Sequence, residues 1–373
     1  MKVINISNKV IKLLFLKLKH FYLNKKELII NKQKSNNTEN SNIKFYSKYY
    51  LIIIFAIINL FFLLFSKPFD KNGNYGLSLE QKMKDYNTKN FSIIRRFECL
   101  KCGFFSYYIV YLGCMNKMFV DGLIPIADLK SFPNAYNGGN TSINNPWEEF
   151  FYQPYNYTLD EVKKYAKNYS YYNCSSYRML RPNEINIYYH ENITSFWHKF
   201  ANNYSPIKNE ILKEAKSIYK KLFGYSKNIL GVKIRGTDYI SIKPNGHSVQ
   251  PDVEKVLTDV KYMDEKYKYD FIFFATEDEI IKQKFIEMLN YGNKLKLLNP
   301  KVFVHYNYTK NRFKINAHKL IYGNLEYTKN YVLNIIILSK CLDLVASRCT
   351  GTAAIYILTN GFRHSIIYNL GMY

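Results

Sequence analysis

The residues best suited to bind a ligand surround Arg235, near the end of a predicted β-strand. Apolar and polar side chains alternate from Val232 to Arg235, which is the period of a strand with one buried face. A guanidinium is always charged and matches the geometry of phosphate oxygens. The sequence therefore predicts that Arg235 binds a diphosphate at the carboxyl end of the strand, where open α/β sheets hold their ligands. The alternative is a structural ion pair between Arg235 and Asp238.

Two further predicted strands also end in polar residues. Segment 271–275 is followed by Thr276-Glu-Asp278, and segment 344–346 is followed by Ser347-Arg-Cys-Thr-Gly-Thr352. The carboxyl ends of parallel strands open into one crevice, so we expect all three ends to lie together. The last segment precedes a predicted helix, whose free N–H groups favour an anion. An ordinary helix cap followed by a closely packed glycine would give the same pattern.

Strand, turn and helix units repeat through most of the chain, a pattern typical of parallel, doubly wound sheets. We expect an α/β fold with two domains facing a cleft. The first domain is predicted over 93–225, and the second, which holds the three strand ends, over 226–373. Upstream we predict a basic tail over 1–48, a transmembrane helix over 49–66 and a stem over 67–92.

These motifs, taken in order, resemble those of the fucosyltransferase superfamily that includes the α-1,6-, α-1,2- and protein O-fucosyltransferases. Lys233-Ile-Arg-Gly-Thr-Asp238 is similar to its first motif, His-x-Arg-x-x-Asp. Phe274–Asp278 is similar to the second motif, and Leu333–Ser339 with Val345–Gly351 to the third. The chain looks closer still to a largely bacterial group of polysaccharide-cluster glycosyltransferases, through Gly103–Ser106, Ile124–Asp128, Asn145–Phe151, Lys243–His247, Gln250–Pro251, Leu338–Cys341 and Leu370–Tyr373. The resemblance covers about residues 95–373.

The resemblance implies a GT-B fold, two Rossmann-like domains around a cleft, and inverting transfer from GDP-fucose to a glycan or glycoprotein without a metal. Arg235 would hold the donor diphosphate and stabilise the leaving GDP, and Asp238 would orient that arginine or its loop. The donor phosphates would also contact Ser347, Thr350, Gly351 and Thr352. Two positions depart from the family: Lys233 replaces its histidine, and Asn334 replaces the acid that contacts guanine in the α-1,6 enzymes. An amide cannot accept two guanine N–H bonds as a carboxylate does, so the donor sugar nucleotide stays open.

The catalytic base is the other open assignment. A base must reach the acceptor hydroxyl, and His247, in the loop after the first motif, is the candidate by type and position. Asp128, at the end of a strand predicted in the first domain, is the alternative. A transferase of the same fold that uses another nucleotide sugar, or a lectin-like binding protein, would share many of these features.

The predicted transmembrane helix is an uncharged apolar run between Lys48 and Lys67, long enough to span a thin bilayer. Lysines dominate the preceding tail, so the positive-inside rule keeps the N-terminus cytoplasmic and makes the chain a type II membrane protein. Sequons in the remainder indicate a glycosylating lumen, the Golgi in our prediction; they begin at Asn90, Asn140, Asn156, Asn168, Asn173, Asn192, Asn203 and Asn307. If the sequons arose by chance, a bacterial inner membrane would fit instead.

The net charge and the cysteines indicate whether the chain binds nucleic acid, holds zinc or forms disulfides. The net charge of +24 comes mostly from lysine, and neither clustered arginine nor a stacking motif accompanies it, so we predict no nucleic-acid partner. A zinc site is not expected, because Cys99 and Cys102 have no second pair at ligand spacing. Disulfides are expected among some of the six cysteines, with the pairing open. Cys341 is predicted to be a core residue.

Overall fold

The computed structural model describes residues 76–97, 102–174, 184–236, 238–241, 243, 245–298 and 325–373. The predicted tail (1–48), the predicted transmembrane helix (49–66) and the whole sequon at Asn307 lie outside these ranges. So does segment 301–305, which the sequence predicts to be a short strand. In the ranges that the structure describes, no helix has the length and apolar character needed to cross a membrane.

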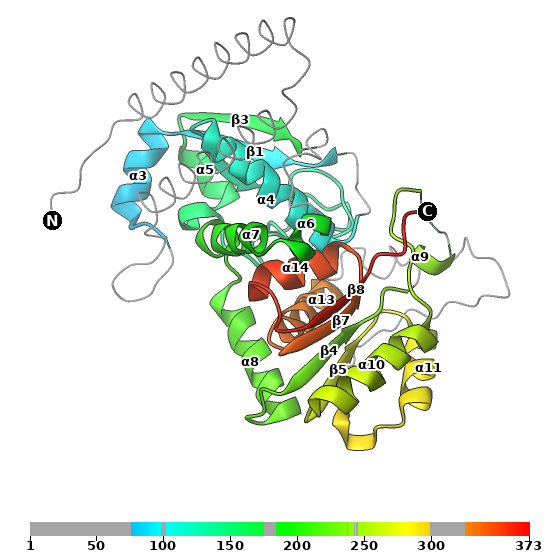
Figure 1. The fold of residues 1–373 in the computed structure, drawn as a ribbon. Helices are drawn as coiled ribbons and strands as arrows, with labels where there is room; N and C mark the ends of the chain where they lie inside the picture. Colours follow the sequence, from blue (N-terminus) through cyan, green and yellow to red (C-terminus); the bar gives the residue numbers. More distant parts are fainter. Residues whose placement is uncertain are drawn as a thin grey trace, which may run out of the picture. The chain divides into compact units, whose positions relative to one another are not determined.

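The first sheet has three parallel strands in the order β2-β1-β3 (Figure 1). They are β1 (Asn90–Arg95), β2 (Ile124–Ala127) and β3 (Asn168–Asn173). Four helices accompany them: α3 (Leu79–Thr88), α4 (Phe104–Val120), α5 (Leu159–Tyr165) and the short η2 (Pro154–Asn156). Thr158-Leu-Asp-Glu161 has the spacing of a capping box, and the structure confirms it: the Thr158 side chain accepts the Glu161 N–H, and the Glu161 side chain accepts the Thr158 N–H.

The described part of the predicted stem is folded. Residues 79–88 form α3, and the side chain of Tyr86 packs against Phe91 of β1 and Tyr157, with ring centroids 5.7 and 5.4 Å apart. The polar surface of α3 resembles a linker in sequence, but its buried aromatic residue belongs to the core of the first sheet. The first sheet therefore begins upstream of the predicted boundary at residue 93.

The second sheet has five parallel strands in the order β6-β5-β4-β7-β8. They are β4 (Ile229–Lys233), β5 (Phe271–Ala275), β6 (Leu295–Lys296), β7 (Asp343–Ser347) and β8 (Ser365–Tyr368). Counted along the chain from β4, this is the Rossmann order 3-2-1-4-5, which reverses direction between β4 and β7. The helices are α6 (Glu184–Tyr189), α7 (Glu191–Tyr204), α8 (Asn209–Phe223), α9 (Asp238–Ser241), α10 (Val253–Tyr267), α11 (Glu279–Leu289), η4 (Gly292–Lys294), α13 (Leu325–Leu338) and α14 (Thr350–Thr359).

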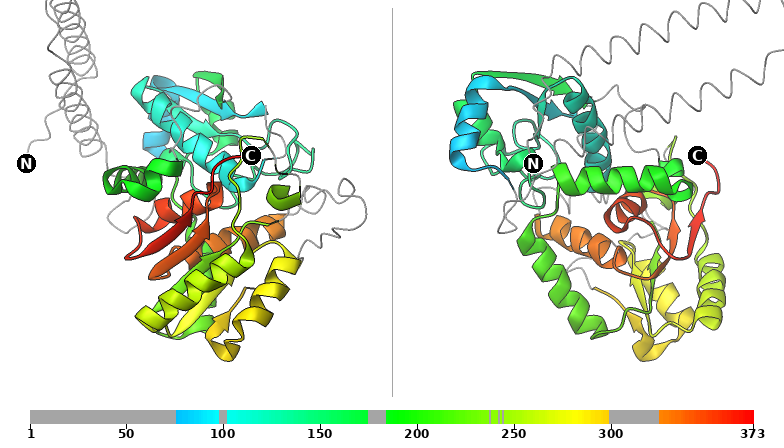
Figure 2. Two further views of the ribbon diagram at one scale, coloured as in Figure 1. Left: turned by 45° about the vertical axis from the view of Figure 1, so that its right-hand side comes forward. Right: turned by 60° about the vertical axis from the view of Figure 1, so that its left-hand side comes forward.

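Helices cover both faces of the second sheet (Figure 2). Val232 and Phe274 point into a core shared with α10 and α11. On the opposite face, Phe223 of α8 contacts the rings of Phe271 and Phe273. A methyl group on Gly231 would come 3.1 Å from Leu338 and 3.2 Å from Cys341, so this glycine lets α13 approach the strand closely. The alternation in β4 therefore sends Val232 to one helical layer and Lys233 to the other.

Most predicted elements of the second half are confirmed, with shifts at their ends. The sequence predicts a helix over 209–223 and a strand over 271–275, and α8 and β5 have these bounds. It also predicts a helix over 331–342, but α13 begins and ends earlier, so Cys341 follows the helix instead of lying in it, although it is buried as expected. A further helix is predicted from residue 353, but α14 begins at Thr350, because the predicted loop residues form its first turn.

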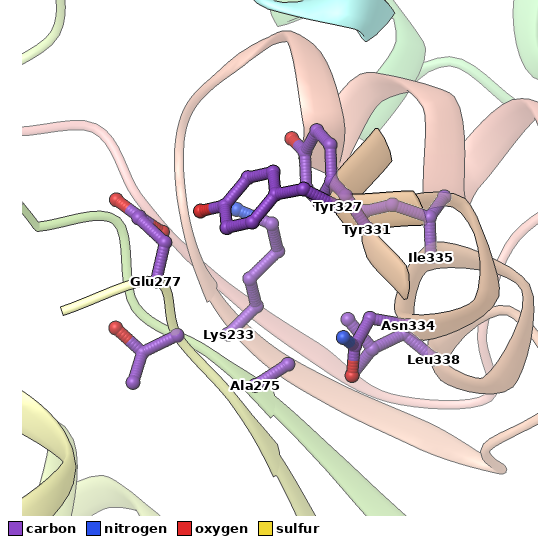
Figure 3. A pocket seen from close by; sticks show the side chains of 9 residues that line it. Lys233, Ala275, Glu277, Tyr327, Tyr331, Asn334, Ile335 and Leu338 are labelled. Carbon is purple, nitrogen blue, oxygen red and sulfur yellow. The ribbon is translucent and has the colours of Figure 1, made fainter. Parts of the chain in front are cut away.

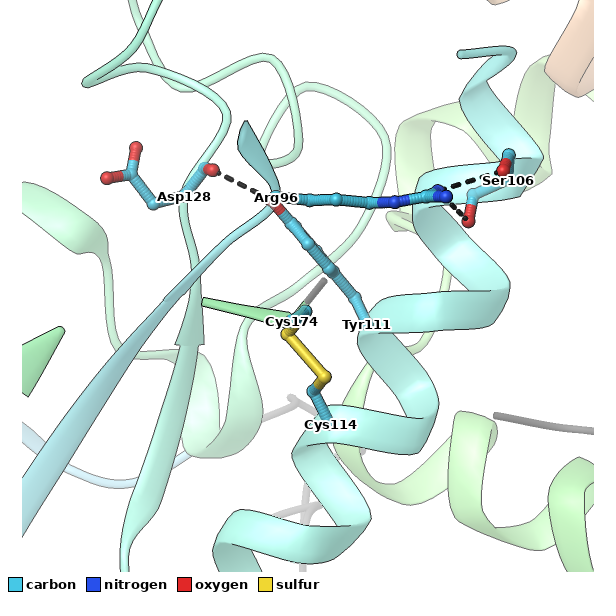
Figure 4. The surroundings of a disulfide bond; sticks show 6 residues. All are labelled: Arg96, Ser106, Tyr111, Cys114, Asp128 and Cys174. Carbon is cyan, nitrogen blue, oxygen red and sulfur yellow. Dashed lines mark hydrogen bonds between the residues drawn. A yellow bond between two sulfur atoms is a disulfide. The ribbon is translucent and has the colours of Figure 1, made fainter. Parts of the chain in front are cut away.

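A disulfide joins Cys114 of α4 to Cys174, directly after β3 (Figure 4). Their Cα atoms are 6.2 Å apart, and the bond closes a loop between residues 60 positions apart. Cys102 is also disulfide-bonded. These bonds confirm that some cysteines are oxidised, and the bond between Cys114 and Cys174 ties α4 to the edge strand of the first sheet.

Candidate functional site

The three polar strand ends meet at one edge of the second sheet, as predicted. We call this the carboxyl edge: residues 233–236 after β4, 276–278 after β5 and 347–352 after β7. Lys233 pairs in register with Ala275 on one side and Ala346 on the other. β4 and β7 are the strands at which the sheet order reverses. A hydrogen bond from the Arg235 backbone N–H to the side-chain oxygen Ser347 Oγ (3.0 Å) links their ends. In α/β sheets, ligands bind at this reversal point.

Arg235 is held by Glu277, from the neighbouring strand end. Its guanidinium nitrogen lies 3.0 Å from Glu277 Oε1, which also accepts the Gly236 N–H at 2.8 Å. The guanidinium carbon is 5.0 Å from the centre of the Tyr239 ring. Arg235 therefore forms an ion pair with Glu277 and is three-quarters buried beside the reversal point. The structure does not describe the side chain of Asp238, so its predicted role remains a prediction.

Gly236 and Asp278 explain why the first motif carries a glycine. A methyl group on Gly236 would come 2.5 Å from Asp278 Cβ and 2.7 Å from Ile281, so only glycine fits. Asp278 is buried and caps α11 by accepting the N–H groups of Ile280 and Ile281. The second strand end thus has one structural acid, Asp278, and one acid that faces Arg235, Glu277.

The residues after β7 form the N-terminus of α14. Cys349 is the N-cap, and its side chain accepts no bond from the helix N–H groups. The hydroxyl of Thr352 donates to the Ser347 carbonyl at 2.7 Å, and Ser347 Oγ accepts from Arg235 N–H. These two hydroxyls therefore fix the loop rather than facing a ligand. The first N–H groups of the helix, among them those of Thr350 and Gly351, remain available to an anion.

A small open pocket of about 40 Å³ lies beside the carboxyl edge, between the ends of β4 and β5 and one face of α13 (Figure 3). It is lined by Lys233, Ala275, Thr276, Glu277, Tyr327, Tyr331, Asn334, Ile335 and Leu338. Asn334 donates to the Asn330 carbonyl at 3.0 Å, while its buried Oδ1 has no partner among the described residues. That oxygen is placed to accept a hydrogen bond from a ligand. Two tyrosine rings beside it provide an aromatic wall.

The pocket wall is braced by the first sheet's helix α4. The ring of Phe105 packs edge-on against Tyr331 at 5.2 Å. Tyr331 in turn fills the space that a side chain at Gly351 would take, since a methyl group there would lie 2.3 Å from the Tyr331 hydroxyl oxygen. The pocket therefore depends on residues from both halves of the described chain.

The two candidate bases differ sharply. Asp128 is fully buried, and its carboxylate accepts from Arg95 Nε at 2.8 Å and from the Lys130 and Ser131 N–H groups. Its carbonyl also accepts from Tyr111 (Figure 4). These bonds give Asp128 a structural role at the end of β2, and we no longer retain it as a base.

His247 is exposed and lies near the carboxyl edge. Its ring meets the Tyr239 ring edge-on at 5.2 Å, and Tyr239 in turn contacts Arg235. One ring nitrogen, Nδ1, is 3.2 Å from the Asn245 carbonyl, so Nε2 is the nitrogen that can accept a proton. His247 thus keeps both the access and the position that a base requires.

Three residues of the site were missed by the sequence reasoning. Glu277 was placed at a strand end without a role, and Tyr327 and Tyr331 were not considered. A signal for the tyrosines exists: residues 327, 331, 334, 335 and 338 recur at helical spacing and form one face of α13. Glu277 had no comparable signal. Among the described residues, no group of three His, Cys, Asp or Glu side chains is arranged to hold a metal ion.

No family model and no curated protein matches this chain. Among solved structures, it is similar to the NodZ alpha-1,6-fucosyltransferase soaked with GDP-fucose, with 13% identity, coverage of 76% of this chain and 96% of that one, and a TM-score of 0.42. It is also similar to the fucosyltransferase NodZ from Bradyrhizobium (13%, 72% and 92%, 0.41) and to the apo form of POFUT1 (10%, 75% and 98%, 0.46). The case for a function accordingly rests on the residues and geometry of the site itself.

Proposed function

We propose that this chain is an inverting glycosyltransferase of GT-B fold that transfers fucose from GDP-fucose to a glycan or glycoprotein. One observation carries the proposal: Arg235, Lys233 and the open N-terminus of α14 converge where the order of the second sheet reverses. This arrangement suits a nucleoside diphosphate, because cations and helix N–H groups both stabilise its phosphates. The order of the motifs supports fucose as the sugar.

We assign the steps of the reaction to residues of the site as follows. His247 takes the proton of the acceptor hydroxyl, and the acceptor oxygen forms a bond to the anomeric carbon of the donor. The bond from that carbon to the β-phosphate oxygen breaks, and the electron pair leaves with GDP. Arg235 stabilises the negative charge that develops on the leaving diphosphate. Because charged side chains and helix N–H groups can neutralise this charge, no step in the proposal requires a metal.

A donor screen tests the proposal. The full-length chain is incubated with GDP-fucose, GDP-mannose and UDP-linked sugars, and released nucleotide is measured with and without glycan acceptors. We expect GDP to raise the melting temperature and GDP-fucose to be the donor that is consumed. Stabilisation by UDP and not by GDP would replace fucose with another donor of the same fold. Glycan binding without consumption of any donor would favour a lectin-like protein.

We further propose that the chain is a single-pass type II protein of the Golgi membrane. The sequence of 49–66 supports the anchor, and the disulfide between Cys114 and Cys174 suits an oxidising lumen. Sequon asparagines at the surface would accept glycans there; the exposed ones are Asn90, Asn140, Asn168, Asn173 and Asn192. Removal of N-linked glycans should increase the mobility of the chain from its own cells on a denaturing gel. Unchanged mobility would contradict a glycosylating lumen.

A further inference from the structure

Lys233 is a buried cation at the carboxyl edge that has no acidic partner in the described part of the chain. It is the last residue of β4 and only 3% exposed. Its ammonium donates to Cys349 Sγ at 3.3 Å, and among the described residues no carboxylate lies within ion-pair distance of it. Burying an ammonium is costly unless a counter-charge compensates it. The site therefore favours an incoming anion.

The ammonium of Lys233 lies beside the N-terminus of α14. Its bonding partner Cys349 is the N-cap of that helix, and Cys349 Sγ also contacts Thr352 Oγ1 at 3.4 Å. Lys233 Cε would be 3.3 Å from a methyl group on Gly351, so the missing side chain of this glycine leaves room for the lysine. The side chain extends from β4 toward the two tyrosines of α13 (Figure 3). A phosphate bound by the first N–H groups of α14 would thus meet Lys233.

Arg235 and Lys233 differ in how their charges are balanced. The charge of Arg235 is offset by Glu277 at 3.0 Å, whereas Lys233 has a thiol as its neighbour. The negative charge of a bound diphosphate would therefore interact with the full charge of Lys233, whereas the charge of Arg235 is already offset by Glu277. The histidine that the resembled superfamily has at this position would not carry a permanent charge.

We propose that Lys233 is a catalytic residue whose ammonium contacts the phosphate that leaves with the nucleotide. The inference deepens the proposed function and rests on it. When the bond between the anomeric carbon and the β-phosphate oxygen breaks, the electron pair stays on that oxygen. The ammonium of Lys233 stabilises the added negative charge, and no proton leaves the lysine. Cys349 then serves to hold the ammonium in place before the donor binds.

Calorimetric titrations of the full-length chain with GDP and with guanosine test this inference. Lys233→Met removes the charge at similar length and should weaken GDP binding about 10- to 100-fold, the range for a hydrogen bond to a charged group. Guanosine, which has no phosphate, should bind the variant as it binds the wild type. Lys296→Met is the matched control, because it removes a lysine charge from β6 of the same sheet, outside the carboxyl edge; it should leave GDP affinity unchanged.

Each other outcome is decisive. Equal GDP affinity of Lys233→Met and wild type would overturn the role of Lys233 while leaving the proposed function intact. Equal losses in Lys233→Met and Lys296→Met would overturn the role of Lys233, because the effect would then follow from the lower charge of the chain and not from a contact with the phosphate. A wild-type chain that binds no nucleoside diphosphate would overturn both proposals. Should Lys233→Met fail to fold, Lys233→Gln keeps a polar side chain, removes only the charge, and is expected to show the same loss.

Discussion

The two ends of β7 differ in whether their charged side chains are balanced by partners within the protein. At its first residue, Asp343 is fully buried and accepts bonds from Arg363 and Tyr269, both at 2.5 Å, and from His364 N–H at 2.8 Å. Burial alone would raise the pKa of Asp343, but the bonds from Arg363, Tyr269 and His364 lower it below its ordinary value. We call this cluster the amino-edge ion pair. Every charge in it has a partner within the protein.

At the other end of β7, the carboxyl edge holds three cations, Lys233, Arg235 and Arg348, and two acids, Glu277 and Asp278. Glu277 offsets Arg235, and Lys233 has no carboxylate beside it in the described part of the chain. The contrast shows how to separate a structural charge from a binding one on the same sheet. Charges that are balanced internally stabilise the fold, whereas an unbalanced buried cation favours an anionic ligand. Asp128, balanced by Arg95 and two N–H groups, belongs with the structural class.

The largest expected effect comes from Arg235→Ala. Loss of one group that stabilises the leaving charge should lower kcat/KM for the donor about 100- to 1,000-fold. The matched control is Arg363→Ala at the amino edge, which should lower the melting temperature and leave kcat/KM of the folded enzyme unchanged. Steady-state rates of nucleotide release measure both. Equal losses of activity in the two variants would break the distinction between the edges.

His247→Ala should lower kcat about 100-fold, at the low end of what general base catalysis contributes. GDP affinity should not change, because the exposed ring of His247 is not part of the donor pocket. Asp128→Asn is the control from the other sheet: it should reduce stability and leave kcat of the folded enzyme unaltered. Rapid-quench measurement of a single turnover separates the chemical step from binding. A loss of turnover in Asp128→Asn alone would return that residue to the role of base.

Asp343→Ala should reduce the free energy of unfolding by about 2 kcal/mol, because it leaves the buried Tyr269 hydroxyl without an acceptor. Donor affinity should stay at the wild-type value, since the amino edge lies at the far end of the strands. Urea unfolding followed by circular dichroism provides the first quantity, and GDP titration the second. Reduced GDP affinity in a folded variant would count against two independent edges.

Gly351→Ala should weaken GDP binding about tenfold, a loss of about 1.4 kcal/mol. The added methyl group would displace the Tyr331 hydroxyl from the pocket wall, since the two would be 2.3 Å apart. The double variant with Tyr331→Phe removes the hydroxyl that clashes and should recover most of the affinity. If the second substitution brings no recovery, the loss arises from the helix N-terminus itself.

The smallest effect is a pH dependence of stability at the amino edge. The folded-state pKa of Asp343 is lowered, so its carboxylate stabilises the fold above the ordinary value of 3.8, and this contribution disappears as the pH falls through the folded-state pKa. The wild-type chain should therefore lose more unfolding free energy below about pH 4 than Asp343→Ala does. Urea titrations at a series of pH values measure the difference. Parallel curves would contradict the assignment.

Local sequence patterns predicted which residues form the carboxyl edge, but they did not reveal that Arg235 pairs with Glu277 there. The alternation in β4 and the polar residues after β5 and β7 are properties of short segments, so the sequence revealed them. The pair between Arg235 and Glu277 is different: the two residues are far apart in the sequence, and the strand order brings them together. Burial is equally non-local. Asp128 follows a strand just as Arg235 does, and only the packed structure shows that its carboxylate is enclosed.

The central claim is that Lys233 and Arg235, at the end of β4, bind a nucleoside diphosphate, and a structure of the chain with GDP tests it most directly. We predict that the diphosphate lies within hydrogen-bond distance of Lys233, Arg235 and the first N–H groups of α14. The guanine ring should lie in the pocket beside Asn334. GDP bound elsewhere, or phosphates that contact none of these groups, would contradict the account.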